Sequence, residues 1–255
     1  MTIIESIKQQ KPTMERYIVF DIETASLDFD SFSESQQEYL VRGAVTDEEI
    51  EQKKFMLGLY PFTAQVVCIG LQLMEGVNGE YEIKNEAAFS TLPDYDGEEG
   101  AELTLPSGKQ CLLYTERGLL EAFWKIVTKY SGATLISFNG RSFDVPFLML
   151  RSALLKIRPS RNLMSGTKWN YPGHTDLIDE LSFYNPSPYS ASKRFNFDFY
   201  TRAFGITSPK SEGVDGSMVS ELYNKGEIAT ISDYCLRDIN ATWELFLVWQ
   251  KYLKF

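Results

Sequence analysis

The chain has 255 residues, a length typical of one large α/β domain or at most two small ones. Hydrophobic residues make up 44% and charged residues 24%, which is enough apolar material for a core and excludes an intrinsically disordered chain. Neither the N-terminal segment nor any later run approaches the ~20 apolar residues that a membrane span needs. We therefore expect a soluble, non-secreted protein without membrane partners.

Three widely spaced cysteines, Cys68, Cys111 and Cys235, fit neither a disulfide framework nor a zinc knuckle. Cys68 and Cys111 lie in apolar, strand-like runs and are predicted to be small buried side chains. This cysteine usage favours a reducing cytoplasm.

The formal net charge of −10 is unevenly distributed. Residues 74–103 contain nine acids and one base, and residues 28–54 contain eight acids and three bases, whereas residues 141–210 contain ten bases and five acids. The basic sector, residues 141–210, is either the footprint of a phosphate backbone or an ordinary solvated surface.

The first half of the chain favours strands, and an Asn78-Gly79 turn signal indicates a hairpin. Residues 1–14 are expected to form a loose arm, and acidic insertions are expected near 28–60 and 85–108. The predicted strands are Arg16–Ile22, Ala64–Leu73, Tyr81–Lys84 and Lys109–Tyr114.

The second half alternates helical periodicity with one short strand. Several strands come first in the chain, and a further strand then lies between helices. This order predicts a mixed β-sheet flanked by α-helices, in a single domain over 15–255. The predicted strand is Thr134–Phe138, and the predicted helices are Glu116–Tyr130, Asp144–Ile157, Asn196–Phe204, Met218–Lys225 and Ile228–Leu253.

Two acids, Asp21 and Glu23, end the first predicted strand. Strand alternation places both on one face, with Ile22 on the other. Two such carboxylates repel each other unless a cation lies between them, although acids at a strand end can simply face solvent.

A third acid, Asp144, follows a tight turn predicted at Asn139-Gly140, directly after a buried strand. It lies near the start of a predicted helix, where Asp is also a common capping residue, so this acid by itself favours a cap.

The last predicted helix carries Tyr234 and Asp238 on one face, because positions i and i+4 are neighbours. The rest of that face is apolar, so burying this pair calls for a partner or for a small polar pocket closed between them. Carboxylates are the ligands that Mg²⁺ prefers, and two such ions support phosphodiester hydrolysis without a histidine or cysteine nucleophile.

Asp21-x-Glu23, Asn139-x-x-x-Phe143-Asp144 and Tyr234-x-x-x-Asp238 occur in the order found in the DEDD 3′–5′ exonucleases, whose fold is ribonuclease H-like, and Tyr234 resembles the mark of the tyrosine (DEDDy) subgroup. The segments FNGRSFDVPFL, HTDLIDEL and YCLRD are most similar to stand-alone proteins related to the proofreading domain of family B DNA polymerases. The resemblance covers roughly residues 16–250. The acidic insertions depart from it, and we expect neither a polymerase domain nor a helical RNA-binding domain.

The resemblance implies two Mg²⁺ or Mn²⁺ ions held by Asp21, Glu23, Asp144 and Asp238. Asp21, Glu23 and Asp238 would hold the first ion, which binds the attacking water; Asp21 would bridge to the second, and Asp144 would reach that ion directly or through water. Tyr234 would orient the water, because its unperturbed pKa of ~10 makes it a poor base.

The resemblance implies contacts to the terminal nucleotide at Thr24 and Leu27. Further substrate contacts are expected at Asn139, Arg141, Phe143, Lys193 and Arg194, although Phe143 also fits a core position. His174 and Asp176 by themselves lack the further ligands that a metal site needs, so we expect them to have a structural role near the cleft. With a site at Asp144, the basic sector becomes the favoured substrate track.

The sequence thus predicts a two-metal 3′–5′ exonuclease that releases nucleoside monophosphates from nucleic acid, with single-stranded DNA ends favoured over RNA. Two alternatives remain at this stage: a catalytically silent module of the same fold that binds nucleic acid or a protein partner, and a phosphodiesterase acting on short oligonucleotides or a nucleotide-derived small molecule.

Overall fold

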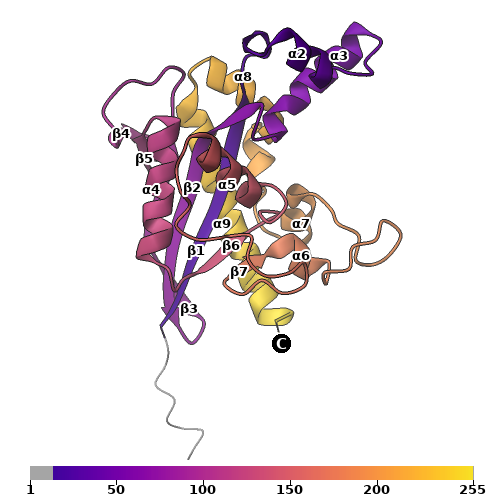
Figure 1. Cartoon of the computed structure of the whole chain (residues 1–255). Helices are drawn as coiled ribbons and strands as arrows, with labels where there is room; N and C mark the ends of the chain where they lie inside the picture. The colour runs from indigo at the N-terminus through magenta and orange to yellow at the C-terminus, as the bar shows by residue number, and fades with distance from the viewer. Residues whose placement is uncertain (1–13, 255) are drawn as a thin grey trace, which may run out of the picture.

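A computed structural model describes residues 14–254. The predicted N-terminal arm therefore lies outside the described residues, apart from Met14. Seven strands form one mixed sheet in the order β4-β5-β3-β2-β1-β6-β7, which confirms the predicted fold class (Figure 1). The strands are β1 Glu15–Ser26, β2 Ala64–Val77, β3 Glu80–Ser90, β4 Ala101–Thr104, β5 Gln110–Leu113, β6 Thr134–Ser137 and β7 His174–Asp176.

The central strand β1 is antiparallel to β2 and parallel to β6. The β2–β3 hairpin turns at Asn78 and Gly79, whose φ angles are both positive (57° and 86°), as the turn signal predicted. Because β6 and β7 run parallel to β1, the carboxyl ends of these three strands lie at one end of the sheet.

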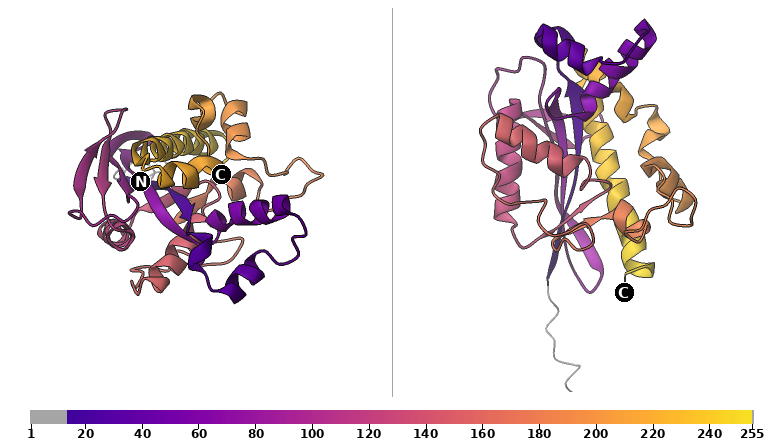
Figure 2. Two further views of the ribbon diagram at one scale, coloured as in Figure 1. Left: turned by 90° about the horizontal axis from the view of Figure 1, so that it is seen from above. Right: turned by 45° about the vertical axis from the view of Figure 1, so that its right-hand side comes forward.

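Helices cover both faces of the sheet (Figure 2). Helices α4 (Glu116–Lys129) and α5 (Asp144–Leu154) pack on one face through a core that includes Phe20 and Phe123. Helices α8 (Val219–Asn224) and α9 (Ile228–Tyr252) pack on the other through a core that includes Val19 and Leu236. The remaining helices are α2 Glu34–Leu40, α3 Asp47–Phe55, α6 Leu177–Leu181 and α7 Phe197–Ala203, with short 3₁₀ turns η2 Phe29–Ser31, η3 Met56–Leu59, η4 Pro209–Glu212 and η5 Gly216–Met218.

The two acidic segments differ in structure. Residues 28–60 form the helices α2 and α3, neither of which has a buried residue, and they project from one end of the molecule (Figure 1). A hollow of about 1000 Å³ lies among these residues. The four predicted metal-binding acids, Asp21, Glu23, Asp144 and Asp238, do not line it. In the second segment, β3 continues to Ser90 instead of ending at Lys84, and residues 101–104 form β4, so part of the acidic segment 85–108 belongs to the sheet.

Cysteines lie inside the sheet–helix interface. Cys68 and Cys111 are buried, as predicted, and Cys235 is buried as well. Helix α9 approaches β2 closely at Gly70, where a β-carbon would lie 2.9 Å from Sγ of Cys235 and 3.3 Å from its carbonyl oxygen. The close approach of α9 to β2 therefore requires a residue without a β-carbon at position 70.

Gly70→Ala is expected to lower the melting temperature, because α9 must move away from the sheet to admit the methyl group. Overpacking of this kind costs about 1–3 kcal/mol, and each kcal/mol lowers the melting temperature by about 2–4 °C in a chain of this size. Thermal unfolding followed by circular dichroism checks this. Gly132→Ala, where no atom lies within 4 Å of the added carbon, is the matched control; equal melting temperatures for the two variants would contradict the packing argument.

Candidate active site

Strand β1 brings two carboxylates to the face covered by α9. Asp21 and Glu23 alternate with Phe20 and Ile22, which point into the opposite core. Glu23 is buried at 7% exposure, and the pairing of β1 with β2 shifts register immediately after it. Such an irregularity re-aims the side chains that follow. The predicted same-face placement of the two acids is therefore present.

Asp144 is the first residue of α5, but it is not the cap of that helix, since Phe143 occupies the N-cap position. Its Oδ1 instead accepts a hydrogen bond of 3.0 Å from the backbone amide of Ile22. The side chain is 3% exposed. Asp144 thus reaches across to β1 between the two acids of the first motif, which excludes the capping interpretation.

Helix α9 supplies Tyr234 and Asp238, one turn apart and 6% and 9% exposed. Their helical face packs on β1 and β2, with Ile231, Ala241 and Leu245 among the buried residues. Because α9 lies over the acid-bearing face of β1, the third motif meets the first one directly.

The four carboxylates are close enough to perturb one another. Burial raises the pKa of the Asp21 carboxyl well above its ordinary value, and the charges of Asp144 and Asp238 raise it further. The pKa of Glu23 is raised for the same reasons, with Asp238 as its main charged neighbour. Burial likewise raises the pKa values of Asp144 and Asp238 to about 7. Such a cluster is unfavourable when all four carboxyl groups are ionised, and a nearby positive charge stabilises it.

Tyr234 belongs to the same electrostatic group. Burial raises the pKa of its phenol, and the charges of Asp238, Glu23 and Asp21 raise it further. The phenol therefore stays protonated at neutral pH, which makes it a hydrogen-bond donor and not a base.

A pocket of about 240 Å³ opens onto two of these acids, Asp21 and Asp238. Lys210, on η4, lines it and acts to lower the pKa of Asp238. Sequence reasoning counted Lys210 only as one base of the basic sector; no motif places it near Asp238. The lining residues are Asp21, Phe138, Asn196, Phe197, Asp198, Pro209, Lys210, Tyr234, Asp238 and Thr242.

The donor set suits hard divalent cations. Carboxylate oxygens from β1, α5 and α9 converge beside a solvent-accessible pocket, and oxygen is the ligand atom that Mg²⁺ and Mn²⁺ prefer. A thiol lies close by, because one ligand atom each of Asp21, Glu23 and Cys235 fall within 4.8 Å of one another. The Cys235 thiol contacts the backbone carbonyl of Asp21 at 3.6 Å and its carboxylate at 3.7 Å.

The predicted substrate residues after the first motif lie beyond the acids. Thr24 Oγ1 donates to the carbonyl of Gly58 at 2.7 Å and so ties β1 to the base of the α2–α3 segment. The Leu27 amide donates to the carbonyl of Thr63 at 2.9 Å. Both residues line hollows next to α8, and neither lines the pocket that contains Asp21.

The turn of the second motif contains three more predicted residues. Asn139 has a φ of 66°, as the turn signal predicted. The guanidinium of Arg141 lies 4.0 Å above the ring of Tyr171 and donates to two backbone carbonyls. Phe143 is half-buried and packs on Phe147, the core position weighed as its alternative.

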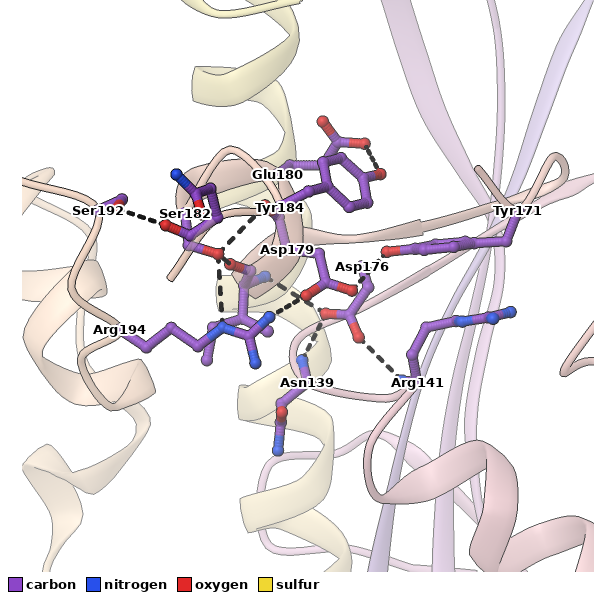
Figure 3. Close-up of polar contacts among 12 residues, drawn as sticks. Asn139, Arg141, Tyr171, Asp176, Asp179, Glu180, Ser182, Tyr184, Ser192 and Arg194 are labelled. Carbon is purple, nitrogen blue, oxygen red and sulfur yellow. Dashed lines mark hydrogen bonds and ion pairs between the residues drawn. The ribbon is translucent and has the colours of Figure 1, made fainter. Parts of the chain in front are cut away.

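The basic sector is only partly engaged within the protein, because several of its bases, such as Lys156 and Arg158, are exposed. Arg151 pairs with Glu116, and Arg194 pairs with Asp179 while donating to Ser182 (Figure 3). Lys193 is exposed, with its ammonium group 5.1 Å from the ring centre of Phe195.

His174 and Asp176 form β7, beside the second motif. His174 Nε2 and Ser137 Oγ lie 2.8 Å apart, and burial together with two nearby arginines lowers the pKa of His174 to about 3. The imidazole is therefore neutral and structural, as expected. Asp176 accepts hydrogen bonds from the backbone of the 139–141 turn (Figure 3).

Among residues 14–254, none of the helices is long and apolar enough to cross a membrane.

Comparison with known proteins identifies the family. Residues 103–254 match a family model described as a predicted 3′–5′ exonuclease related to the exonuclease domain of PolB. The structure resembles that of the family B DNA polymerase from the hyperthermophilic archaeon Pyrobaculum calidifontis, with a TM-score of 0.54, 19% identity, and coverage of 96% of this chain but 25% of the polymerase. No curated protein matches the sequence. The chain therefore belongs to the family of predicted 3′–5′ exonucleases related to the exonuclease domain of PolB.

Proposed function

We propose that the protein is a Mg²⁺- or Mn²⁺-dependent 3′–5′ exonuclease that removes nucleoside monophosphates from single-stranded DNA. The observation that carries this proposal is the convergence of Asp21, Glu23, Asp144 and Asp238, from three separate elements, into one buried cluster, of which Asp21 and Asp238 line the pocket. The raised pKa values of these acids indicate a site whose negative charge a cation would stabilise.

Asp21, Glu23 and Asp238 are proposed to hold one ion, and Asp21 and Asp144 a second. When bound, the ions would lower the pKa of a water nucleophile and stabilise the leaving oxygen of the phosphodiester. The charges of all three other acids act on Asp21, which suits a bridging ligand. The amide of Ile22, the residue between Asp21 and Glu23, donates to one oxygen of Asp144 and so holds this carboxylate against β1.

Tyr234 and Lys210 are proposed to act on water and substrate. The protonated phenol of Tyr234 would orient the attacking water by a hydrogen bond. Lys210 lines the pocket opposite a dense group of negative charges, so its ammonium group would bind a substrate phosphate as it enters.

A labelled-strand assay tests the function and its polarity. With 5′-labelled single-stranded DNA and Mn²⁺ or Mg²⁺, we expect a ladder shortened from the 3′ end, released nucleoside monophosphates, and no reaction in EDTA. Phosphorothioate linkages at the 3′ end should block the ladder, whereas the same linkages at the 5′ end should not. RNA and dinucleotides of matched sequence test the proposed substrate preference. Absence of product with either metal, or degradation from the 5′ end, would contradict the proposal.

Lys210→Met is expected to weaken single-strand binding by roughly ten-fold and to reduce the slope of log affinity against log salt by about one. The physical reason is the loss of one phosphate contact inside the pocket. Fluorescence anisotropy in EDTA, where no hydrolysis is expected, measures both quantities. Lys125→Met, on the exposed surface of α4, is the control; unchanged affinity and slope for Lys210→Met would remove Lys210 from the substrate site.

A further inference from the structure

Asp176 is a fully buried carboxylate outside the acid cluster, at the end of β7. Its Oδ1 accepts hydrogen bonds from the backbone amides of Asn139 at 2.7 Å and Ile178 at 3.3 Å. Its Oδ2 accepts a bond of 2.8 Å from the amide of Arg141 (Figure 3). Both oxygens are thus engaged by backbone, and two of the three donors belong to the turn that precedes α5.

That turn determines where Asp144 lies. Asn139 adopts a φ of 66°, and its carbonyl accepts from the amides of Ser142 and Phe143 at 3.0 and 3.1 Å. The carbonyl of Gly140 then accepts from Val145 at 2.8 Å. The chain reverses within these residues and enters α5 at Asp144, so a shift of the turn moves this carboxylate relative to β1.

Strand pairing does not extend to the turn. The register of β6 with β1 ends at Ile136, and that of β6 with β7 ends with Ser137 opposite Asp176. Beyond the last paired residues of these strands, the side chain of Asp176 supplies the hydrogen bonds to the turn. One of its oxygens accepts from the amide of Asn139 and the other from the amide of Arg141. Two charge-assisted bonds to backbone amides are the strong kind of hydrogen bond and restrain both position and orientation.

We propose that Asp176 is a positioning residue that acts through the 139–141 turn to hold Asp144 where it can bind a divalent cation. This inference rests on the proposed function, in which Asp144 is a ligand. An asparagine in place of Asp176 has almost the same shape but only one acceptor oxygen. Its NH₂ group would therefore face a backbone N–H, and at least one bond to the turn would be lost.

Mn²⁺ binding, measured from the electron paramagnetic resonance signal of the free ion, tests the proposal without substrate. We expect Asp176→Asn to weaken the same Mn²⁺-binding event that Asp144→Asn weakens, by about ten-fold or more. The double variant should bind no more weakly than Asp144→Asn, because both changes act on one ligand. Asp179→Asn is the matched control: Asp179 lies on α6, which directly follows β7, and contacts Tyr171 and Arg194, and no hydrogen bond joins its carboxylate to the turn.

Each outcome decides a separate point. Wild-type Mn²⁺ affinity in Asp176→Asn, full additivity in the double variant, or equal loss in Asp179→Asn would overturn the positioning role. If Asp144→Asn itself leaves Mn²⁺ binding unchanged, the proposed function fails instead. Amide exchange in the wild-type protein provides a measurement that needs no folded variant: the amides of Asn139 and Arg141 should be protected by at least ten-fold relative to unfolded peptide rates, and rapid exchange at both would also overturn the proposal.

Discussion

Replacing Asp21 by Asn is expected to abolish hydrolysis and, in EDTA, to raise the melting temperature. Activity should fall at least about 1000-fold, because losing a carboxylate proposed to hold both cations forfeits several kcal/mol of transition-state stabilisation. Stability should rise because the variant removes a buried charge that its neighbours repel. Each kcal/mol gained corresponds to about 2–4 °C.

The sign of the pH dependence follows from the raised pKa of Asp21. Between the ordinary and the raised pKa the folded state binds more protons than the unfolded state, so the wild-type protein loses stability as pH rises through this interval. The stability gain of Asp21→Asn should therefore be absent below the ordinary carboxyl pKa, where both proteins carry a neutral group, and should grow as the pH rises above it. Mn²⁺ should stabilise the wild-type protein at pH 8 more than the variant.

Differential scanning fluorimetry across pH, with and without Mn²⁺, measures these effects, and the labelled-strand assay measures the loss of activity. Asp96→Asn, at an exposed position in a loop, is the matched control and should change neither quantity. Retained hydrolysis in a purified Asp21→Asn preparation would refute the site, whereas a lowered melting temperature in EDTA would refute the repulsion argument.

Replacing Tyr234 by Phe is expected to lower kcat by about 100-fold, at the low end for loss of a group that directs proton transfer. Single-strand affinity and Mn²⁺ affinity should stay unchanged. The phenol has a raised pKa and remains protonated, so it is expected to orient water without binding the cation. The pH–rate profile of the wild-type protein should accordingly show no ionisation that disappears in the variant.

Single-turnover kinetics with excess enzyme separates this effect from product release. Tyr184→Phe controls for the loss of a partly buried tyrosine hydrogen bond. The hydroxyl of Tyr184 donates to Glu180 over 2.7 Å, and neither residue belongs to the acid cluster. A change in Mn²⁺ affinity equal to the change in kcat would show that Tyr234 supports the cation site instead of the water.

Local periodicity accounts for the parts of the site that sequence reasoning predicted. Asp21 and Glu23 share a face because strand side chains alternate, and Tyr234 and Asp238 share one because helix positions four apart are neighbours. The Asn78 and Asn139 turns were predictable for a similar reason, since asparagine tolerates a positive φ. The helices α2 and α3 were not predicted, because they bury no residue and so have no apolar periodicity.

Long-range contacts account for what the sequence left undetermined. Asp144 accepts from Ile22 instead of capping its helix, Lys210 enters the pocket from a 3₁₀ turn, and the guanidinium of Arg194 pairs with Asp179. Each pairing depends on how distant segments pack.

The sequence alone determined the chemical groups, their order and the face that each one occupies, because these follow from repeats of two and 3.6 residues along the chain. The tertiary structure decided which charges meet. A partner more than a hundred residues away, such as Ile22 for Asp144, is selected by the closure of the sheet and its helices and has no local signature.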